Sequence, residues 1–384
     1  MNSVTTAPTL TPDTTSRRSE QYSARRVLWS ESSLKRVRTC GHHGILPDGN
    51  VAVKLSGTAG TDAKAGFSGV ATCGSTWACP VCSAKIGRSR AHDVSAAVAG
   101  WQARGGKVVM VTLTMRHRRG QRLADLWDAL SYAWGRVTSG RAWVNDCETF
   151  GAVIPRKIKT GKKAGQIDNS PRIGFARVVE TTHGKKGWHV HVHALLFVKA
   201  DVSDSGLAAL ADSMYGRWAV ALVERGLTSP VPEHGVDVRV VTDGDGGALG
   251  RYFTKNVFTA DKAGFEIAGG GNKIAHRGNR TPFQILADIL TNGDADDLAI
   301  WHEWEEASHN RRQLTWSAGL RDFLALADEK TDEEIAEEEL GGDVVLVLSA
   351  SEFAVIRWNA EQLLHLIENE PFGTARDWLA EQLS

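Results

Sequence analysis

Three histidines at alternate positions of an apolar run are the residues best placed to do chemistry. His189, His191 and His193 lie within WHVHVHALLF, residues 188–197. Side chains alternate between the two faces of a β-strand, so the three imidazoles share one face and the intervening valines share the other. Neutral imidazole is the commonest side-chain ligand for divalent metal ions. Three in register on one face are hard to explain by packing alone, so the spacing predicts a metal site.

A second strand must position these histidines. Residues 173–182, IGFARVVETT, have the β-branched composition of a strand, and HGKKG at 183–187 is typical of a turn. We therefore expect the two strands to pair as an antiparallel hairpin. Glu180 then lies close to the histidine row if its side chain faces the same way.

Four cysteines form a second group with metal-ligand spacing. They are Cys40, Cys73, Cys79 and Cys82. The last two form a Cys-Pro-Val-Cys knuckle, whose two-residue gap lets both sulfurs reach one tetrahedral ion. We predict a structural Zn²⁺ site of four thiolates, in which His42 or His43 could replace Cys40. A redox-active dithiol is disfavoured because no thioredoxin-like βαβ pattern surrounds the knuckle. The fifth cysteine, Cys147, is expected to be a small buried hydrophobe.

Charge is divided unevenly along the 384-residue chain, whose formal net charge is zero. Residues 291–384 hold 6 Lys and Arg against 22 Asp and Glu, whereas residues 1–290 hold 39 against 23. A basic region of this size suits a polyanion such as nucleic acid. Two basic segments are candidate DNA contacts, one after a strand and one in a glycine-bearing loop: Arg116, Arg118 and Arg119, and then Lys157, Lys159, Lys162 and Lys163.

Composition also indicates where the chain resides. No uninterrupted apolar run approaches the ~18 residues needed to cross a bilayer, and residues 1–26 lack the apolar core of a secretion signal. We therefore expect a soluble, cytoplasmic protein without a membrane partner, in which thiols stay reduced.

The order of predicted elements indicates an α+β fold on a mostly antiparallel sheet. Strands are expected over 107–115, 173–182, 188–197 and 236–241, with amphipathic helices between them. We divide the chain into a disordered tail (1–26), a zinc-binding element (27–90), a central domain that carries the histidines (91–280), a tryptophan-rich helical segment (281–327), an acidic linker (328–342) and a small C-terminal unit (343–384).

A helix after the glycine-rich loop TDGDGGALG carries a tyrosine and a lysine on one face. Tyr252 and Lys255 are three residues apart, whereas Leu249, Phe253 and Val257 form an apolar stripe at helical spacing. We expect the stripe to face the core. The tyrosine and the lysine then project away from it, which suits a reactive face.

Taken in order, VTLTM, GWHVHVHALLF and RYFTK resemble the three motifs of the HUH endonucleases, specifically the rolling-circle replication initiators of small actinobacterial and other Gram-positive plasmids. CGSTWACPVCSAKI, RTPFQILADI and RRQLTWSAGLR are similar to segments of the same initiators, so the resemblance covers roughly residues 35–325. It implies a central antiparallel sheet of about five strands flanked by helices, an N-terminal zinc-binding element and a helical C-terminal extension. Residues 91–280 would then be the nicking domain.

The resemblance also implies a catalytic metal. His191 and His193 align with the family's histidine pair, and the Mg²⁺ or Mn²⁺ that they hold would neutralise charge on a scissile phosphate. A third ligand is needed. Either Glu180 or His189 could complete the set.

By the same resemblance, Tyr252 is the nucleophile that forms a 5′-phosphotyrosine link. A free phenol, with pKa ~10, is a poor nucleophile near neutral pH. Lys255 would therefore assist it or hold the phosphate. Many relatives carry a glutamate four residues before the tyrosine to activate water for the terminating cleavage, but this chain has Ala248. Asp243 and Asp245 could supply that base, or could belong to a turn and a helix N-cap.

The sequence thus predicts an enzyme that nicks and rejoins DNA at a plasmid origin, single-stranded at the nick, to start rolling-circle replication. The resemblance implies host helicase, single-strand-binding protein and polymerase as partners, and a homodimer is left open. Origin recognition could come from the zinc element, from the loop over 156–172 or from the tryptophan-rich helices. A conjugative relaxase or a single-strand transposase would use the same chemistry. A non-catalytic zinc-containing regulator is the alternative from another class, and a metalloenzyme for small substrates would leave the basic region unexplained.

Overall fold

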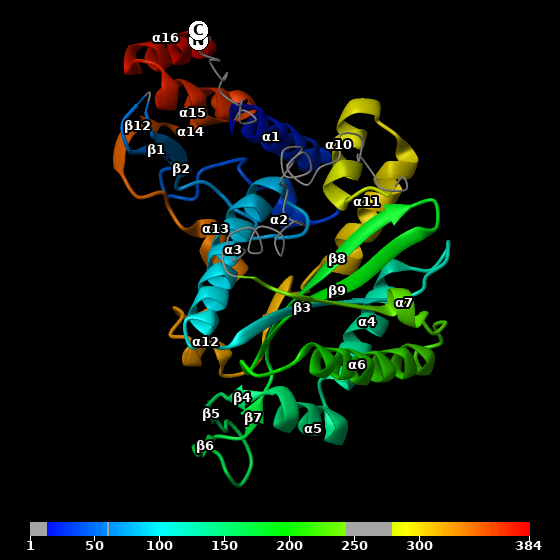
Figure 1. The fold of residues 1–384 in the computed structure, drawn as a ribbon. Helices are drawn as coiled ribbons and strands as arrows, with labels where there is room; N and C mark the ends of the chain where they lie inside the picture. Colours follow the sequence, from blue (N-terminus) through cyan, green and yellow to red (C-terminus); the bar gives the residue numbers. More distant parts are fainter. Residues whose placement is uncertain (1–13, 60, 243–278) are drawn as a thin grey trace, which may run out of the picture.

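The computed structural model describes residues 14–59, 61–242 and 279–384, and its centre is a five-stranded sheet (Figure 1). The strand order is β10, β3, β9, β8, β11, and each neighbouring pair is antiparallel. The strands are β3 (Lys107–Thr114), β8 (Gly174–Gly184), β9 (Gly187–Val198), β10 (Val236–Val240) and β11 (Leu314–Trp316). The prediction of a central antiparallel sheet is confirmed.

The hairpin of β8 and β9 sets which side chains share a face. Lys185 and Lys186 form its turn, between the paired Gly184 and Gly187, and Gly187 has a φ of +84°, which favours glycine. This turn fixes the register of both strands. A slip of one residue would move every side chain of β9 to the other face.

Helices cover both faces of this sheet (Figure 1). Helices α4 (Leu123–Val137), α6 (Asp204–Glu224) and α11 (Ala295–Ser308) share one core with Val190 and Val192. On the other face, α3 (Pro80–Gln102) and α12 (Leu320–Phe323) pack around Leu195 and Phe197. The histidine row lies on this second face, nearer the hairpin turn.

Segments from the two ends of the chain form a smaller sheet, at the upper left of Figure 1. β1 (Val51–Ser56) pairs with β2 (Lys64–Ser68) on one side and with β12 (Asp343–Leu348) on the other. Its buried valines pack against α14 (Ala350–Ile356) and α15 (Ala360–Asn369). Residues 343–384 therefore do not form the separate unit that was predicted, because β12 completes a sheet begun near the N-terminus.

Helix α1 (Thr14–Glu31) occupies much of the predicted disordered tail, and that prediction is wrong from Thr14 onward. The Nη1 and Nη2 atoms of Arg18 each donate to a carboxylate oxygen of Glu368 in α15, at 2.8 Å. Leu28 is fully buried. Contacts with distant parts of the chain thus order a segment that is too polar to be predicted as a packed helix.

The predicted acidic linker also has structure of its own. It contains α13 (Asp332–Glu337), whose Ile335 and Ala336 are buried. Lys85 donates to the carbonyl of Ala336 at 2.9 Å, and Arg90 donates to Asp332 at 3.1 Å. Apolar and charged contacts therefore hold α13 against α3.

Short elements join these layers. They are α2 (Lys35–Arg38), α5 (Gly140–Phe150), α7 (Pro232–Gly235), α10 (Pro282–Asn292), η2 (Arg357–Asn359) and α16 (Phe372–Leu383), with the two-residue strands β4 (Ala152–Val153), β5 (Arg156–Lys157), β6 (Ile167–Asp168) and β7 (Pro171–Arg172). The loop predicted over 156–172 therefore contains strand pairs. No helix in the described part of the chain is long and apolar enough to cross a membrane.

Candidate metal centre

Glu180, His191 and His193 converge on the second face of the sheet. Glu180 of β8 is directly opposite His191 of β9, and His193 is opposite Thr112 of β3. Oε2 of Glu180 lies 3.1 Å from Nε2 of His191 and 2.8 Å from Nε2 of His193. One ligand atom from each residue lies within 4.8 Å of the other two, so this group can hold a metal ion.

The surroundings of this group suit a divalent cation. Burial raises the pKa of Glu180, but hydrogen bonds and charge from His191 and His193 outweigh it and bring that pKa well below its usual range. The carboxylate is therefore ionised. Oγ1 of Thr112 lies 2.9 Å from Nδ1 of His193, which orients the ring and leaves Nε2 directed at Glu180. Two imidazoles and a carboxylate are a donor set used for divalent first-row metals.

The Glu180 side of this group is the more open one. The Glu180 side chain is 27% exposed, whereas those of His191 and His193 are 12% and 6% exposed. Nδ1 of His191 is buried without a hydrogen-bond partner in the described part of the chain. An ion bound here would thus be held from the sheet and could take further ligands from the Glu180 side.

His189 lies outside the group of three ligands. Its ring packs between those of His117 and His191, with ring centroids 4.9 Å and 5.0 Å away. Of the two candidates for a third ligand, the structure brings only Glu180 to the histidine pair. Both ring nitrogens of His117 are buried without a partner among the described residues. No role of its own was predicted for this histidine from the sequence, because nothing in a loop sequence predicts the direction of its side chain.

Acid is expected to destabilise the metal-free protein through His189. Burial, followed by the neighbouring His191 and His117, lowers the pKa of His189 to about 4, whereas an unfolded histidine titrates near 6.5. Its stabilising effect is complete above pH ~6.5 and is lost as the pH falls toward 4, because the unfolded chain then binds the proton more tightly. Urea unfolding at pH 7 and pH 4.5 should show a decrease of about 2 to 3 kcal/mol that His189→Gln removes.

The matched control for that prediction is His309→Gln, at an exposed histidine on the rim of a hollow beside α11. It should retain the pH dependence of the parent protein. If His189→Gln and His309→Gln have the same pH dependence as the parent, the predicted coupling is wrong.

The four predicted cysteines also meet. Sγ of Cys40 lies 3.6 Å from those of Cys79 and Cys82, and Sγ of Cys73 lies 3.7 Å from that of Cys82. Four sulfurs bound ~2.3 Å from one zinc ion at tetrahedral corners would be about 3.8 Å apart. All four side chains are buried. This group can therefore bind a structural zinc ion.

The alternative ligands to Cys40 lie outside the cysteine group. The ring of His42 packs against Trp29, and its Nδ1 is 2.9 Å from Nη1 of Arg357. The ring of His43 lies beside that of His42. Cys147 is a buried residue, as expected, and its sulfur accepts a hydrogen bond from the backbone of Ile173.

The residues predicted to carry the nucleophile and its helpers lie outside the described residues. They are Tyr252, Lys255, Ala248, Asp243 and Asp245. The described chain on either side ends at opposite ends of the sheet. Val241 donates to the carbonyl of Val108 at 2.9 Å, and Arg280 pairs with His183 near the hairpin turn. The histidine row lies between these two points along the strand direction.

The two basic segments lie at opposite ends of the sheet. Arg116, Arg118 and Arg119 are exposed, and their loop passes beside Gly187 at the histidine end. The lysines of the loop over 156–172 are exposed too, but they precede the other end of β8 (Figure 1). Only the arginine loop adjoins the Glu180 group.

The tryptophans predicted as possible DNA contacts are mostly structural. Trp301 and Trp304 are buried, and Trp304 stacks on Trp127 and Trp188. Their rings support α11 against the sheet. The tryptophan-rich helices are therefore poor candidates for origin recognition through these rings.

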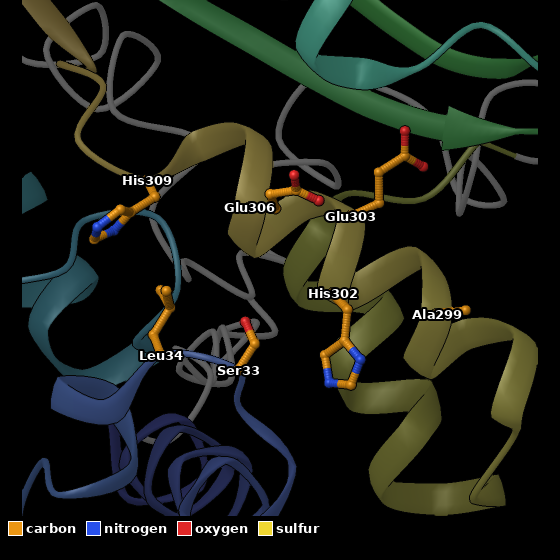
Figure 2. A pocket seen from close by; sticks show the side chains of 7 residues that line it. All are labelled: Ser33, Leu34, Ala299, His302, Glu303, Glu306 and His309. Carbon is orange, nitrogen blue, oxygen red and sulfur yellow. The ribbon is translucent and has the colours of Figure 1, made fainter.

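The hollow in Figure 2, of about 700 Å³, lies between α11 and the chain at Ser33 and Leu34. Two of its polar side chains are already engaged. Nε2 of His302 lies 2.7 Å from the carbonyl oxygen of Glu31. Glu303, which points away from His302 toward the strands, accepts from the backbone of Leu123 and from Nε1 of Trp188, each at 2.8 Å. Glu303 thus anchors the start of β9, a role that no sequence pattern indicated.

Comparison with known proteins gives two relatives from Streptomyces. The chain is 32% identical over 323 residues to Protein rep of Streptomyces lividans, an alignment that covers 72% of this chain and 68% of that protein. It is 32% identical over 145 residues to Neomycin resistance protein of Streptomyces cyanogenus, covering 34% of this chain and 31% of that protein. No family model matches the chain. No solved structure matches it either.

Proposed function

This chain belongs to the plasmid Rep-type proteins, and on that premise we propose that it nicks and rejoins one DNA strand at a plasmid origin to initiate rolling-circle replication. The observation that carries the proposal is the convergence of Glu180, His191 and His193 on one face of the central sheet. A protein that only binds DNA has no need of such a group. Strand cleavage does need one, because charge on the scissile phosphate must be neutralised.

Glu180, His191 and His193 would hold Mg²⁺ or Mn²⁺. When bound, the ion supplies Lewis-acid stabilisation of the phosphate charge. Thr112 keeps His193 in the ligating orientation. The arginine loop next to the hairpin turn, with Lys185 and Lys186, presents positive charge to the strand that enters the site.

The covalent step is assigned to Tyr252 by the motif RYFTK. Its phenolic oxygen forms a bond to phosphorus while the bond from phosphorus to the 3′-oxygen breaks. The phenolic proton is transferred overall to the departing 3′-oxygen, and the 5′-phosphate remains on the tyrosine. Reversal of this exchange rejoins the strand without an external energy source. Lys255, three residues on, would stabilise the phenolate or the phosphate.

The described ends that flank residues 243–278 support this assignment. Val241 and Arg280 are fixed at opposite ends of the sheet, with the histidine row between them along the strands. The Glu180 group thus lies between the two points at which the described chain is interrupted, and this supports placing the nucleophile in the motif between them.

The decisive experiment is to trap the covalent adduct. Supercoiled DNA that carries the cognate origin, incubated with Mg²⁺ or Mn²⁺, should yield a nicked circle with protein attached. Mass spectrometry of the digested adduct should identify the peptide with Tyr252, one of four tyrosines in the chain. Tyr252→Phe should abolish the adduct and spare DNA binding, because phenylalanine lacks only the nucleophilic oxygen.

Tyr132→Phe is the matched control, since Tyr132 is exposed on α4, on the opposite face of the sheet. It should form the adduct normally. An electrophoretic mobility shift of the origin DNA without any covalent adduct would instead indicate a regulator that binds DNA without cutting it. An adduct on another tyrosine would overturn the assignment of the nucleophile.

A further inference from the structure

Residues 152–172 form a narrow two-stranded ribbon that extends from the end of β8 farthest from the hairpin turn (Figure 1). At its base β4 pairs with β7, and farther out β5 pairs with β6. Beyond β5, the amide of Ile158 donates to Gln166 at 2.9 Å, and that of Gly165 donates to Ile158 at 2.8 Å. This basic ribbon is thus hydrogen-bonded at its base and again from β5 outward to its turn.

The basic ribbon carries positive charge without compensation. Lys157, Lys159, Lys162 and Lys163 are all exposed, and no described carboxylate pairs with them. The ribbon's one acidic residue, Asp168, is already engaged by Arg172 and lies 3.6 Å from Arg156. Hydrogen bonds from Ser170, and then the charge of Arg172, lower the pKa of Asp168 to about 2, so it stays ionised and bound to them. The four lysines are left for an external polyanion.

The basic face of the zinc element is not available in the same way. Three of its cations are engaged by the acidic segment around α13: Lys54 with Glu339, Lys85 with the carbonyl of Ala336, and Arg90 with Glu329 and Asp332. Its exposed cations without an acidic partner among the described residues are scattered over separate segments: Lys35, Arg38 and Lys64. The tryptophans of α11 are buried. Of the three segments from which origin recognition could come, the basic ribbon is the one that gathers four exposed lysines without a described carboxylate partner on a single projecting element.

We propose that the basic ribbon inserts into the major groove of duplex DNA that flanks the nick site. The major groove of B-DNA, about 12 Å wide, admits a two-stranded β-ribbon. The lysines would contact phosphates along its edges. Gln166 and Asn169 are exposed on the same ribbon, and their amides are the groups that can read adenine in that groove.

Distance along the sheet separates this contact from the cleavage site. Gly174, where β8 begins, is six residues from Glu180, or about 20 Å at ~3.3 Å per residue. The ribbon lies beyond Gly174. Duplex DNA rises ~3.4 Å per base pair, so the contacted base pairs lie at least about six from the nick. This inference rests on the proposed nicking function, which it deepens by assigning duplex recognition to a surface separate from the metal group.

The test replaces the four ribbon lysines with glutamine in the full-length protein. Duplex fragments tiled across the cognate origin serve as probes over a range of salt concentrations. The affinity for the flanking duplex should fall roughly tenfold to several hundredfold, and the slope of log K against log salt should decrease by about 3 to 4, since each lost phosphate contact accounts for ~0.9. The ratio of nicking on duplex-flanked DNA to nicking on a short single-stranded oligonucleotide should fall by a similar factor.

A charge-matched control removes four exposed cations elsewhere. Its substitutions are Lys64→Gln, Arg141→Gln, Arg312→Gln and Arg376→Gln. It should retain the duplex affinity and the salt slope of the parent protein. The proposal is overturned if both variants lose affinity equally, if neither does, or if the ribbon variant loses affinity only for single strands. The two proposals can fail separately. If the parent protein forms no covalent adduct on any substrate but the ribbon variant still loses duplex binding, the nicking function is refuted and the ribbon remains the duplex-binding surface.

Discussion

Replacing Cys79 with serine is expected to release the structural zinc ion and to unfold the N-terminal part of the protein. Cys79 is fully buried, and its sulfur meets sulfurs from the end of α2, from the following loop and from α3. The group therefore ties together three segments of the chain at one buried point. Zinc contributes an apparent ~10 to 16 kcal/mol to the folding of small zinc domains. Even half of that would be comparable with the whole stability of a typical domain, about 5 to 15 kcal/mol.

The measurements are zinc content and thermal unfolding, with and without a chelator. The parent protein should bind about one zinc ion per chain and lose stability when the ion is removed. Cys147→Ser is the matched control, because Cys147 is also buried but stands apart from the four-sulfur group. Its cost should be about 1 to 2 kcal/mol, with zinc retained. Equal losses in the two variants, or a parent protein without zinc, would mean that the four thiols only pack together.

The hairpin that carries the Glu180 group could be predicted because its signals are local. Alternation in residues 188–197 places the histidines on one face without any knowledge of the rest of the fold. The glycines of HGKKG determine the turn, and the turn determines the register that sets Glu180 opposite His191. The choice between Glu180 and His189 was not local. It depended on the tertiary structure, in which the ring of His189 packs against that of His117 and lies outside the group formed by Glu180, His191 and His193.

The ends of the chain could not be predicted in the same way, because their order comes from distant contacts. The register that joins Val53 to Leu346 links strands 293 residues apart in the sequence, and α1 forms ion pairs with α15. The start of α13, by contrast, carries a local signal. Thr331 and Glu334 form the reciprocal side-chain bonds of a capping box at the start of α13, and Thr-x-x-Glu is a known mark of a helix start.

Burial of the tryptophans also required the tertiary structure. A helix with Trp301 and Trp304 could present its rings to DNA bases or to a core, and periodicity does not distinguish these cases. The stacking of Trp304 on rings from α4 and β9 settles this one in favour of the core. The lysines of the basic ribbon show the converse. Their charge was evident in the sequence, but their separation from the histidines appears only in the fold.

Exchanging Glu180 for glutamine is expected to cost the protein most of its metal affinity and most of its strand cleavage. The change keeps the size of the side chain and removes the negative charge that lies 3.1 Å and 2.8 Å from the two imidazole nitrogens. A neutral amide is a weaker ligand for a hard divalent ion, and its NH₂ group can face the metal. Mn²⁺ affinity should fall about tenfold to a hundredfold and the nicking rate about a hundredfold to a thousandfold, which corresponds to roughly 3 to 4 kcal/mol.

His189→Gln is the informative comparison, because sequence reasoning alone left Glu180 and His189 as alternative third ligands. Its ring lies against His117, outside the group that can share one ion. Mn²⁺ titration followed by calorimetry, and nicking of a short single-stranded oligonucleotide at saturating Mn²⁺, should therefore separate the two variants by at least about tenfold. If His189→Gln lowered Mn²⁺ affinity and nicking more than Glu180→Gln does, the assignment of Glu180 as the third metal ligand would be wrong. If neither change altered metal binding, the convergence of Glu180 with the histidine pair would be a packing arrangement, and the cleavage proposal would lose the observation on which it stands.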